Sequence, residues 1–554
     1  MRLRSSVVRR RGVVLLAVLT IIVLLTLAAY KYNDWMLSEY RAADSSIRAA
    51  QARAFATSGV HYTAALLAAN TADSSLGGNP YDNAGAFQGI AVGSSGGGGG
   101  RSGRFSVLTL PSPDDLSSGS AYRYGVTDEA GKINVNALLD YDGGKGEVGK
   151  KMLLALPNMT DDVASAILDW IDPDSTPRTG GAENETYSAL NPPYRCKNGP
   201  LDSLEELLLV RGVTPQLLFG NDRNRNGIVD PDEDGGGGPV DLGWSAYLTV
   251  YSREVDLNDN RVPRISLMDS DLTSLQQQLV TALGEDMAQY IIAYRLYGGS
   301  SSGSGGSGGS SGARSGGSTT STGTLAEAQA KIAEDLGKGG AGKGKIKSLW
   351  DLVDATVQIT LPQQQQAQPQ APAGRGGRGR TQPQQPQQRT YTLQSPLKET
   401  SRRPELLPKL LDLCTVRAPD SVADLTPRIN INTAPQAVLA ALKEAGGLTD
   451  GDVSSIVSRR PAASGTGSTD AVFRTPAWLM TELNLSKDTL KKVDKFITAR
   501  TQVYRFQAVG YYDQGGPAAR VEAVVDTNQG RPRVVYFRDL SELGRGFDLT
   551  GERR

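Results

Sequence analysis

Residues 9–30 read RRRGVVLLAVLTIIVLLTLAAY, a basic cluster and one glycine followed by an apolar run that carries no charge before Lys31. The run from Val13 to Tyr30 has about the length that crosses the hydrocarbon core of a bilayer. Positive charge favours the cytoplasmic face, so the arginines hold the N-terminal end in the cytoplasm. We therefore expect one transmembrane helix over residues 13–30, with the bulk of the chain across the membrane.

The junction between the basic and apolar segments allows two kinds of processing. A secretory signal ends in a cleavage site of small residues, for which Leu27-Ala28-Ala29 is a fair match. Gly12 instead resembles the end of a prepilin leader, which is cut after the glycine so that the apolar segment stays on the mature protein. Cleavage there makes residues 1–12 the leader and Val13 the new N-terminus.

The composition fits an extracytoplasmic assembly protein better than an enzyme. Lys and Arg together number 59 in the 554 residues, as do Asp and Glu, so the whole chain has no charge excess that would attract nucleic acid. His61 is the one histidine, which argues against a His-based triad or a zinc site with two histidines. Cys196 and Cys414 are far apart in the sequence, and either a disulfide or two unpaired buried thiols fits an oxidising compartment.

The membrane helix is expected to continue over residues 31–70. Its apolar positions recur at spacings of four, three and four, at Ala43, Ile47, Ala50 and Ala54. Such a narrow stripe suits close packing against another helix or a sheet, and an ordinary amphipathic helix gives the same pattern. The stripe alone does not separate these possibilities.

Three stretches have the composition of loops or linkers. Residues 74–103 are rich in Gly, Ser and Asn and predict a loop after the long helix. Residues 298–323 are almost entirely Gly, Ser and Thr, and residues 362–388 are rich in Gln and Pro. Neither of these two inserts is expected to join a core.

The folded regions contain an internal repeat, because KINVNALL at residues 132–139 returns as RININTAP at residues 428–435. Asparagine at these positions suits turns and helix caps. Each copy is followed by two expected helices, at residues 150–156 and 161–172 in the first copy and at residues 435–444 and 450–459 in the second. The pattern resembles a helix-hairpin-helix or SAM-like unit present twice.

Helix-hairpin-helix units in DNA-binding proteins offer a glycine-bearing hairpin and basic residues to a phosphate. The hairpin of the first copy, residues 156–160, has no glycine, and the helix after it carries aspartates that repel phosphate. The second copy is more permissive, with Gly446, Gly447, Arg459 and Arg460. We interpret the repeat as structural, with DNA binding as an alternative.

The middle of the chain carries an ordered set of motifs. They are AILDWIDPD at 166–174, GGAENETY at 180–187, KNGPLDSLEEL at 197–207 and YLTVYS at 247–252. In this order they resemble the central block of general secretion pathway protein K, the K-type minor pseudopilin of type II secretion. Most pilins carry Glu at the fifth mature position and the K type is known for lacking it, and that position is Ala17 here.

The resemblance implies a structural protein, not an enzyme. It implies a minor pseudopilin at the tip of a short periplasmic pseudopilus, supporting protein export across the outer membrane. The partners it implies are the I- and J-type minor pseudopilins, the major pseudopilin, the inner-membrane secretion platform and the prepilin peptidase. The implied location is the inner membrane, crossed once, with the bulk of the chain in the periplasm.

Residues 222–233, DRNRNGIVDPDE, have the pattern of an EF-hand calcium loop. Oxygen side chains stand at loop positions 1, 3, 5, 9 and 12, a glycine at 6 and a backbone carbonyl at 7. The candidate ligands are Asp222, Asn224, Asn226, Ile228, Asp230 and Glu233. We expect an exposed loop that touches little of the core and holds a structural calcium ion; a solvated acidic turn is the alternative. A second acidic candidate comprises Asp169, Asp172, Asp174, Glu183 and Glu185.

The C-terminal part predicts an antiparallel sheet over residues 502–512, 519–527 and 531–538, where Val, Tyr, Phe and Ala alternate between turns. Residues 104–110 and 122–127 can add strands that precede the helical units. The expected fold class is α+β: a long N-terminal transmembrane helix and a pseudopilin-like antiparallel sheet split by inserted helical SAM-like domains.

The expected domain order follows from these elements. It is a leader (1–12), a transmembrane helix (13–30), its periplasmic continuation (31–70), first strands (103–130), a first SAM-like domain with the EF-hand-like loop (131–260), a second SAM-like region with both inserts (261–500) and last strands (501–545).

Two other classes of function remain open from the sequence. A membrane-tethered helix-hairpin-helix protein for DNA uptake would use a basic patch at Arg459 and Arg460. A secreted, calcium-stabilised enzyme would lose the apolar segment by cleavage near Tyr30.

The leader hypothesis predicts the outcome of replacing Gly12 with leucine. The peptidase needs a small residue at the cut, so Gly12→Leu should keep the basic leader attached and stop incorporation into the pilus. Gel migration and N-terminal sequencing measure this directly. A Gly12→Leu chain that migrates and assembles like the parent would show that the prepilin interpretation is wrong.

Overall fold

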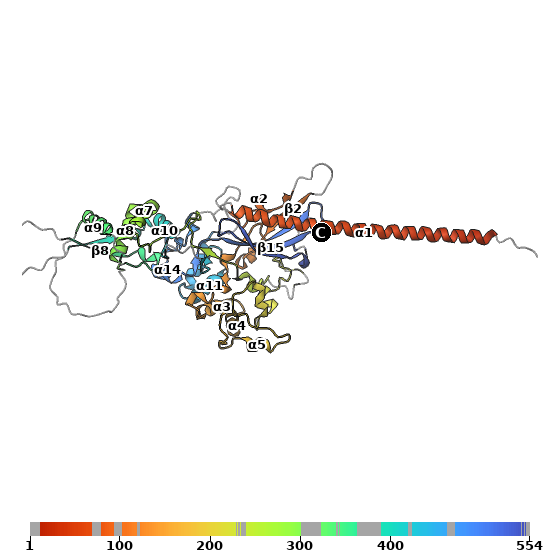
Figure 1. Cartoon of the computed structure of the whole chain (residues 1–554), viewed down its shortest axis with the longest axis horizontal. Helices are drawn as coiled ribbons and strands as arrows, with labels where there is room; N and C mark the ends of the chain where they lie inside the picture. Colours follow the sequence, from red (N-terminus) through yellow and green to blue (C-terminus); the bar gives the residue numbers. More distant parts are fainter. Residues whose placement is uncertain are drawn as a thin grey trace, which may run out of the picture.

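The computed structural model has an elongated body from which one long helix projects (Figure 1). It describes residues 11–68, 79–92, 102–118, 122–228, 230, 233, 240–300, 323–338, 342, 344–362, 389–418, 424–461, 471–544, 546, 547 and 549. The projecting helix is α1, Arg11–Ala68, whose 58 residues span about 87 Å. It is the one helix of the described chain that is long and apolar enough to cross a membrane.

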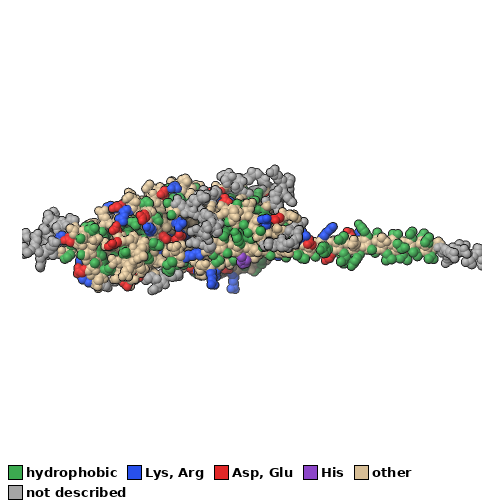
Figure 2. Space-filling model, turned by 90° about the horizontal axis from the view of Figure 1, so that it is seen from above, with side chains coloured by type: hydrophobic (Ala, Val, Ile, Leu, Met, Phe, Trp, Pro, Cys, Tyr) green, Lys and Arg blue, Asp and Glu red, His purple; other side chains and the backbone are tan. Residues whose placement is uncertain are grey.

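Helix α1 has an exposed half and a packed half. Its first half stands clear of the body, and its apolar side chains are in the open (Figure 2). The second half is buried along Ala52, Ala56, Val60 and Leu67, which lie against the sheet. The packing stripe therefore begins at Ala52, where the sheet first covers the helix. The stripe expected from the sequence, from Ala43 to Ala54, remains exposed.

The sheet beneath α1 is antiparallel and combines strands from the two ends of the chain. Its order is β1 (Ile90–Val92), β2 (Gly103–Leu108), β14 (Val503–Tyr512), β15 (Ala519–Asp526) and β16 (Arg533–Asp539), with β3 (Thr127–Asp128) also paired to β14. The strands expected in both regions are thus present, and all the helical units lie between β3 and β14 in the sequence.

The expectation of a plain loop over residues 74–103 is wrong for residues 84–87 and 90–92, and residues 74–78 and 93–101 lie outside the described residues. Residues 84–87 form the short helix α2 (Ala84–Phe87), capped by the side chain of Asn83, which accepts a hydrogen bond from the Ala86 amide. Residues 90–92 form β1, which pairs with β2. Phe87 is fully buried in the core between α1 and the sheet, so this single aromatic residue anchors a segment whose composition otherwise predicts a loop.

The two copies of the repeat have the same local structure. Each begins with a two-residue strand, β4 (Ile133–Asn134) or β12 (Ile429–Asn430), that pairs in parallel with a strand at the end of its unit, β5 (Leu248–Thr249) or β13 (Ile497–Thr498). In each copy the first asparagine side chain accepts from the amide two residues on, at 2.9 Å for Asn134 and 3.0 Å for Asn430. The repeated asparagines therefore form the same turn twice.

The helices expected after each repeat are confirmed with small shifts of their ends. They are α3 (Glu147–Leu154) and α4 (Asp161–Ile171) in the first unit, and α11 (Gln436–Glu444) and α12 (Asp450–Arg459) in the second. Thr160 and Thr449 cap the second helix of each pair. Helix α3 packs against α11, so the two units lie side by side.

A further group of elements lies at the end of the body opposite the free end of α1 (Figure 1). It contains α7 (Leu272–Leu283), α8 (Glu285–Tyr297), α9 (Leu325–Gly337), α10 (Arg403–Leu413) and the hairpin of β8 (Thr356–Leu361) and β9 (Arg389–Gln394). The remaining short elements are α5 (Asn184–Ser188), α6 (Pro215–Phe219), α13 (Trp478–Thr481), α14 (Lys487–Val493), β6 (Glu254–Val255), β7 (Ile265–Ser266), β10 (Cys414–Thr415) and β11 (Asp424–Leu425).

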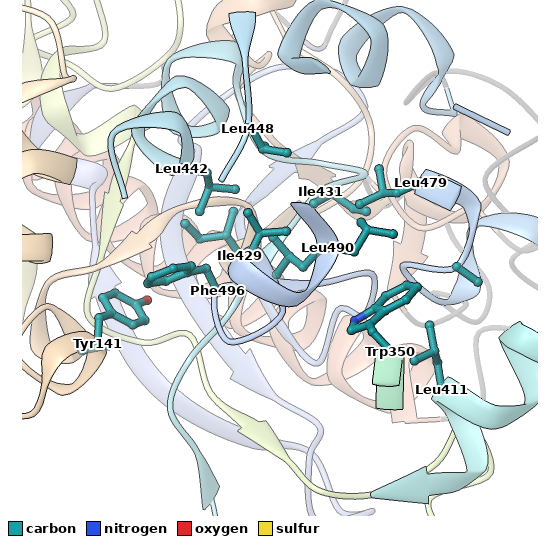
Figure 3. Close-up of a cluster of buried hydrophobic side chains, with 14 of the residues drawn as sticks. Tyr141, Trp350, Leu411, Ile429, Ile431, Leu442, Leu448, Leu479, Leu490 and Phe496 are labelled. Atoms are coloured by element: carbon teal, nitrogen blue, oxygen red, sulfur yellow. The ribbon is translucent and has the colours of Figure 1, made fainter. Parts of the chain in front are cut away.

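One continuous apolar core joins the two repeat units to this distal group. Figure 3 shows Ile429, Ile431 and Leu490 of the second unit between Tyr141 of the first unit and Trp350 of the distal group. The Trp350 indole donates to Asp494 at 2.9 Å, so its polar edge is paired inside the core. Cys196 and Cys414 are both buried and free, which decides the disulfide question in favour of two thiols.

Asp128 ties the sheet to the second repeat unit. This buried carboxylate on β3 accepts from Asn430, Thr433 and Thr501, each at 2.7 Å, and from the amide of Ala130. Burial raises its pKa to about 6 in spite of these donors. The folded state therefore retains a proton on Asp128 at pH values where the unfolded chain has lost it.

Replacing Asp128 with asparagine should remove one pH-dependent part of the stability. Because the folded pKa is raised, Asp128 makes the free energy of unfolding increase as the pH falls from about 6 to about 4, by at most about 3 kcal/mol. Asp128→Asn should lose this increase, whereas the exposed Asp140→Asn should keep it. Urea unfolding of the full chain in detergent at both pH values measures the difference. If the free energy of unfolding changed with pH in the same way for the parent and Asp128→Asn, Asp128 would not be the source of this pH dependence.

Candidate functional site

The residues at the expected processing point lie at the start of α1. Gly12 has no other atom within 4 Å of the place a side chain would occupy, and Val13 is 68% exposed. Both therefore belong to the half of α1 that stands clear of the body. No described part of this chain surrounds Gly12, so a pocket that selects a small residue at this position would have to belong to another protein.

The EF-hand-like loop is folded around its own acidic side chains. Asp222 accepts from the amides of Asn226 and Gly227 at 3.0 and 2.8 Å, and Glu233 accepts from the amide of Asn224 at 2.8 Å. Gly227 has φ of 75°, the left-handed conformation that the sharp turn at loop position 6 requires. The carboxylates at positions 1 and 12 thus point to the inside of the turn.

The remaining candidate ligands of the loop also converge. The side-chain amides of Asn224 and Asn226 both donate to Asp230, while the side-chain oxygen of Asn226 accepts from the amide of Ile228 at 2.7 Å. The side-chain oxygen of Asn224 is buried and accepts no hydrogen bond from a described residue. This oxygen stands at loop position 3, where a calcium loop of the EF-hand type has a ligand.

The loop is not exposed, contrary to expectation. Asp222, Asn226 and Glu233 are 2%, 2% and 8% exposed. The reason is that the loop packs on the face of the sheet opposite α1, where Gln507 of β14 donates to the carbonyl of Arg225 at 2.9 Å. Burial raises the pKa of Asp222, and the nearby Glu233 adds to this effect.

The second acidic candidate is only partly a cluster. Carboxylate oxygens of Asp172, Asp174 and Glu183 lie within 4.8 Å of one another. Asp169 pairs with Arg178 at 2.8 Å, Arg178 also pairs with Asp172 of the group, and Glu185 is exposed outside it. Three of the five expected residues therefore come together, at the end of α4 and the start of α5.

This cluster also has oxygens without donors. One oxygen of Asp172 and both oxygens of Glu183 are buried and accept no hydrogen bond from a described residue. Burial raises the pKa of each carboxyl, and for Glu183 the charge of Asp172 raises it further. Arg178 is already paired with Asp172, whereas Glu183 forms no ion pair with a described residue. A nearly buried carboxylate such as Glu183 is costly unless a cation or a proton neutralises it. Hard oxygen donors of this kind suit calcium.

The basic residues that favoured DNA binding are engaged within the chain. Arg459 pairs with Glu482 at 2.6 Å, and Arg460 pairs with Asp114 at 2.9 Å. A cavity of about 850 Å³ opens nearby, bordered by the sheet and both repeat units. Its charged lining is mostly paired as well, as in the contact between Arg505 and Glu129 at 2.8 Å. No free basic surface is formed by these residues.

Two segments of the chain match the family described as type II secretion system, protein K, at residues 131–219 and 429–492. The first match lies within the first repeat unit and the second within the second unit. Over these two segments the chain is similar to the protein K family.

Individual relatives are similar over a shorter stretch. Type II secretion system protein K of Pectobacterium carotovorum subsp. carotovorum and that of Klebsiella pneumoniae are each 40% identical over 55 residues, 10% of this chain and 17% of the relative. Among solved structures, the GspK–GspI–GspJ complex from the type 2 secretion system of enterotoxigenic Escherichia coli aligns with 90% of this chain and 98% of that chain, at 10% identity and a TM-score of 0.37.

The sheet residues that hold the EF-hand-like loop could not be recognised individually in the sequence. Arg520 on β15 donates to the carbonyls of Asn224 and Arg225, nearly 300 residues earlier. One signal was present: Arg520 and Glu522 alternate with Val521 and Ala523, which predicts one polar face on β15. The sequence does not say whether such a face meets water or a loop.

Proposed function

We propose that the chain is a minor pseudopilin of the type II secretion system, located at the tip of the periplasmic pseudopilus and supporting protein export across the outer membrane. One observation supports this most strongly. The helix that carries the expected membrane segment continues without interruption onto an antiparallel sheet made from both ends of the chain. A subunit built this way can move from the membrane into a fibre without refolding its body.

The position at the tip is supported by Ala17. In the major pseudopilins the Glu at this position is thought to neutralise the amino terminus of the neighbouring subunit. Ala17 lies in the exposed apolar half of α1, and no charged residue occurs between Arg11 and Lys31. Because a carboxylate in the hydrocarbon is costly, the apolar helix enters and leaves the bilayer more easily without it.

The finer assignments belong to the same proposal. The body lies in the periplasm, α1 crosses the inner membrane once, and the prepilin peptidase cuts between Gly12 and Val13. The partners are the I- and J-type minor pseudopilins, the major pseudopilin and the inner-membrane platform. The two repeat units are SAM-like modules inserted into the sheet, with a structural role.

Calcium is part of the proposal at two places. Asp222, Asn224, Asn226, Asp230 and Glu233, with the carbonyl of Ile228, hold one ion in the loop, after the amides of the two asparagines rotate to present their oxygens. Asp172, Asp174 and Glu183 hold another beside α4. The buried oxygens without donors at both places support this. Calcium is plentiful outside the cytoplasm, so sites of about 10⁻⁴ to 10⁻³ M are filled there.

Co-assembly tests the pseudopilin proposal. The detergent-solubilised chain, mixed with the I- and J-type proteins, should elute as one complex containing all three, because a tip subunit has dedicated neighbours. Mixtures that omit the I- or the J-type protein serve as controls. Recovery of the chain only as uniform homopolymers, with or without the two proteins, would contradict the proposed place at the tip.

Calcium stoichiometry tests the metal proposal. Equilibrium dialysis of the full chain should give two ions for the parent and one for each of Glu183→Gln and Glu233→Gln, since each change removes a charged ligand from one place. Glu185→Gln is the matched control for the cluster and should keep two. At about a hundredfold excess over Kd, each ion should raise the free energy of unfolding by about 2.7 kcal/mol. Equal binding by the parent and both ligand variants would show that the two groups are only acidic turns.

A further inference from the structure

The EF-hand-like loop has two faces that serve different partners. On its inner face, the amides of Asn224, Asn226 and Gly227 donate to Glu233 and Asp222. On its outer face, the carbonyls of Asn224 and Arg225 accept from side chains of the sheet. The amides of the inner face and the carbonyls of the outer face belong to the same backbone, residues 224–227. Fixing the carboxylates on the inner face therefore also fixes the carbonyls on the outer face.

The sheet side of this contact is built from neighbouring strands. Gln507 of β14 stands opposite Glu522 of β15, and Arg520 lies two residues before Glu522 on the same face. Gln507 donates to the carbonyl of Arg225 at 2.9 Å, and Arg225 reaches Glu522 at 3.8 Å. The loop therefore contacts the centre of the sheet and not its edge.

Arg520 makes the contact costly to lose. Its side chain is fully buried, no carboxylate of a described residue forms an ion pair with it, and its guanidinium lies over the ring of Phe547 at 5.6 Å. Its hydrogen bonds go to the carbonyls of Asn224 and Arg225. If the loop moves away, a buried charge loses these acceptors, which is strongly unfavourable.

The rest of the loop adds contacts of the same kind. Arg225 pairs with Glu205 of the first repeat unit at 3.1 Å, and Arg538 of β16 pairs with the same carboxylate at 2.7 Å. Glu205 of the first unit is therefore bound both by the loop, through Arg225, and directly by the sheet, through Arg538.

We propose that calcium bound in the loop fixes the docking of the first repeat unit on the sheet. We call this calcium-dependent contact the clasp. Without the ion, the carboxylates repel one another and the loop backbone has several conformations available. With the ion, the carbonyls of Asn224 and Arg225 are held where Arg520 and Gln507 need them. The inference rests on the proposed calcium site and assigns it a role: calcium sets the docking of a helical unit on the pilin-like sheet.

Hydrogen exchange on the full chain in detergent tests the clasp, with calcium compared with chelator. In the parent, calcium should slow exchange in β14 and β15 as well as in the loop, by up to about a hundredfold at a hundredfold excess over Kd. Glu233→Gln should lose the effect. Glu183→Gln, which removes the other proposed ion, should keep it. These two variants separate the clasp from a general effect of calcium.

A second variant tests the contact itself. Gln507→Met keeps the volume of the side chain and the strand pairing but removes the donor to Arg225. It should bind two calcium ions like the parent and lose part of the calcium-dependent protection of β14 and β15, because Arg520 still donates to the same loop carbonyls. Suppose that the parent binds calcium through Glu233 but that calcium leaves the hydrogen exchange of β14 and β15 unchanged. This result would overturn the proposed clasp but not the calcium site. Absence of any Glu233-dependent binding would overturn both.

Discussion

The close approach of α1 to the sheet is the contact on which the rest of the structure depends. A side chain at Gly510 of β14 would come within 2.1 Å of the Ala52 carbonyl and 2.5 Å of the Ala56 amide. Such distances leave room for hydrogen only, so helix and strand touch backbone to backbone. This contact fixes the second half of α1 and leaves the first half free to enter a membrane. Because β14 also pairs with β2, β3 and β15, the same strand joins the two ends of the chain.

The sheet carries the first helical unit on the face opposite α1 and the second unit beside β3. Gln507 reaches the EF-hand-like loop of the first unit, while Asp128 on the neighbouring β3 is bound to Asn430 and Thr433 of the second. Each unit is thus attached to the sheet through buried polar groups. Such groups specify one arrangement, since a misplaced unit leaves donors and acceptors unpaired. A pilin-like sheet can in this way carry large inserted units without losing its own register.

Local patterns in the sequence predicted most helices and strands correctly. They did not predict the contacts between residues that are far apart in the sequence. The alternation of apolar and polar residues predicted strands β14 to β16. The repeated Ile-Asn-x-Asn segments marked the two places where a helix pair follows. The packed stripe of α1 was misplaced, because small apolar residues recur on several faces of the helix and only the sheet selects one. The burial of the EF-hand-like loop was also missed: acidic composition predicts exposure, and a cover supplied by Arg520 and Gln507 nearly 300 residues later leaves no local trace.

The most direct test of this account is the stability of Gly510→Ala compared with Gly337→Ala, which adds the same methyl group where no atom lies within 4 Å. Urea unfolding of the full chain in detergent gives both values, and hydrogen exchange over residues 52–68 locates the effect. The account predicts that Gly510→Ala loses roughly 1–3 kcal/mol and exposes the second half of α1. Gly337→Ala, at the last residue of α9, should keep the stability or raise it by up to about 1 kcal/mol. Equal stability of the two variants, with α1 protected in both, would contradict it.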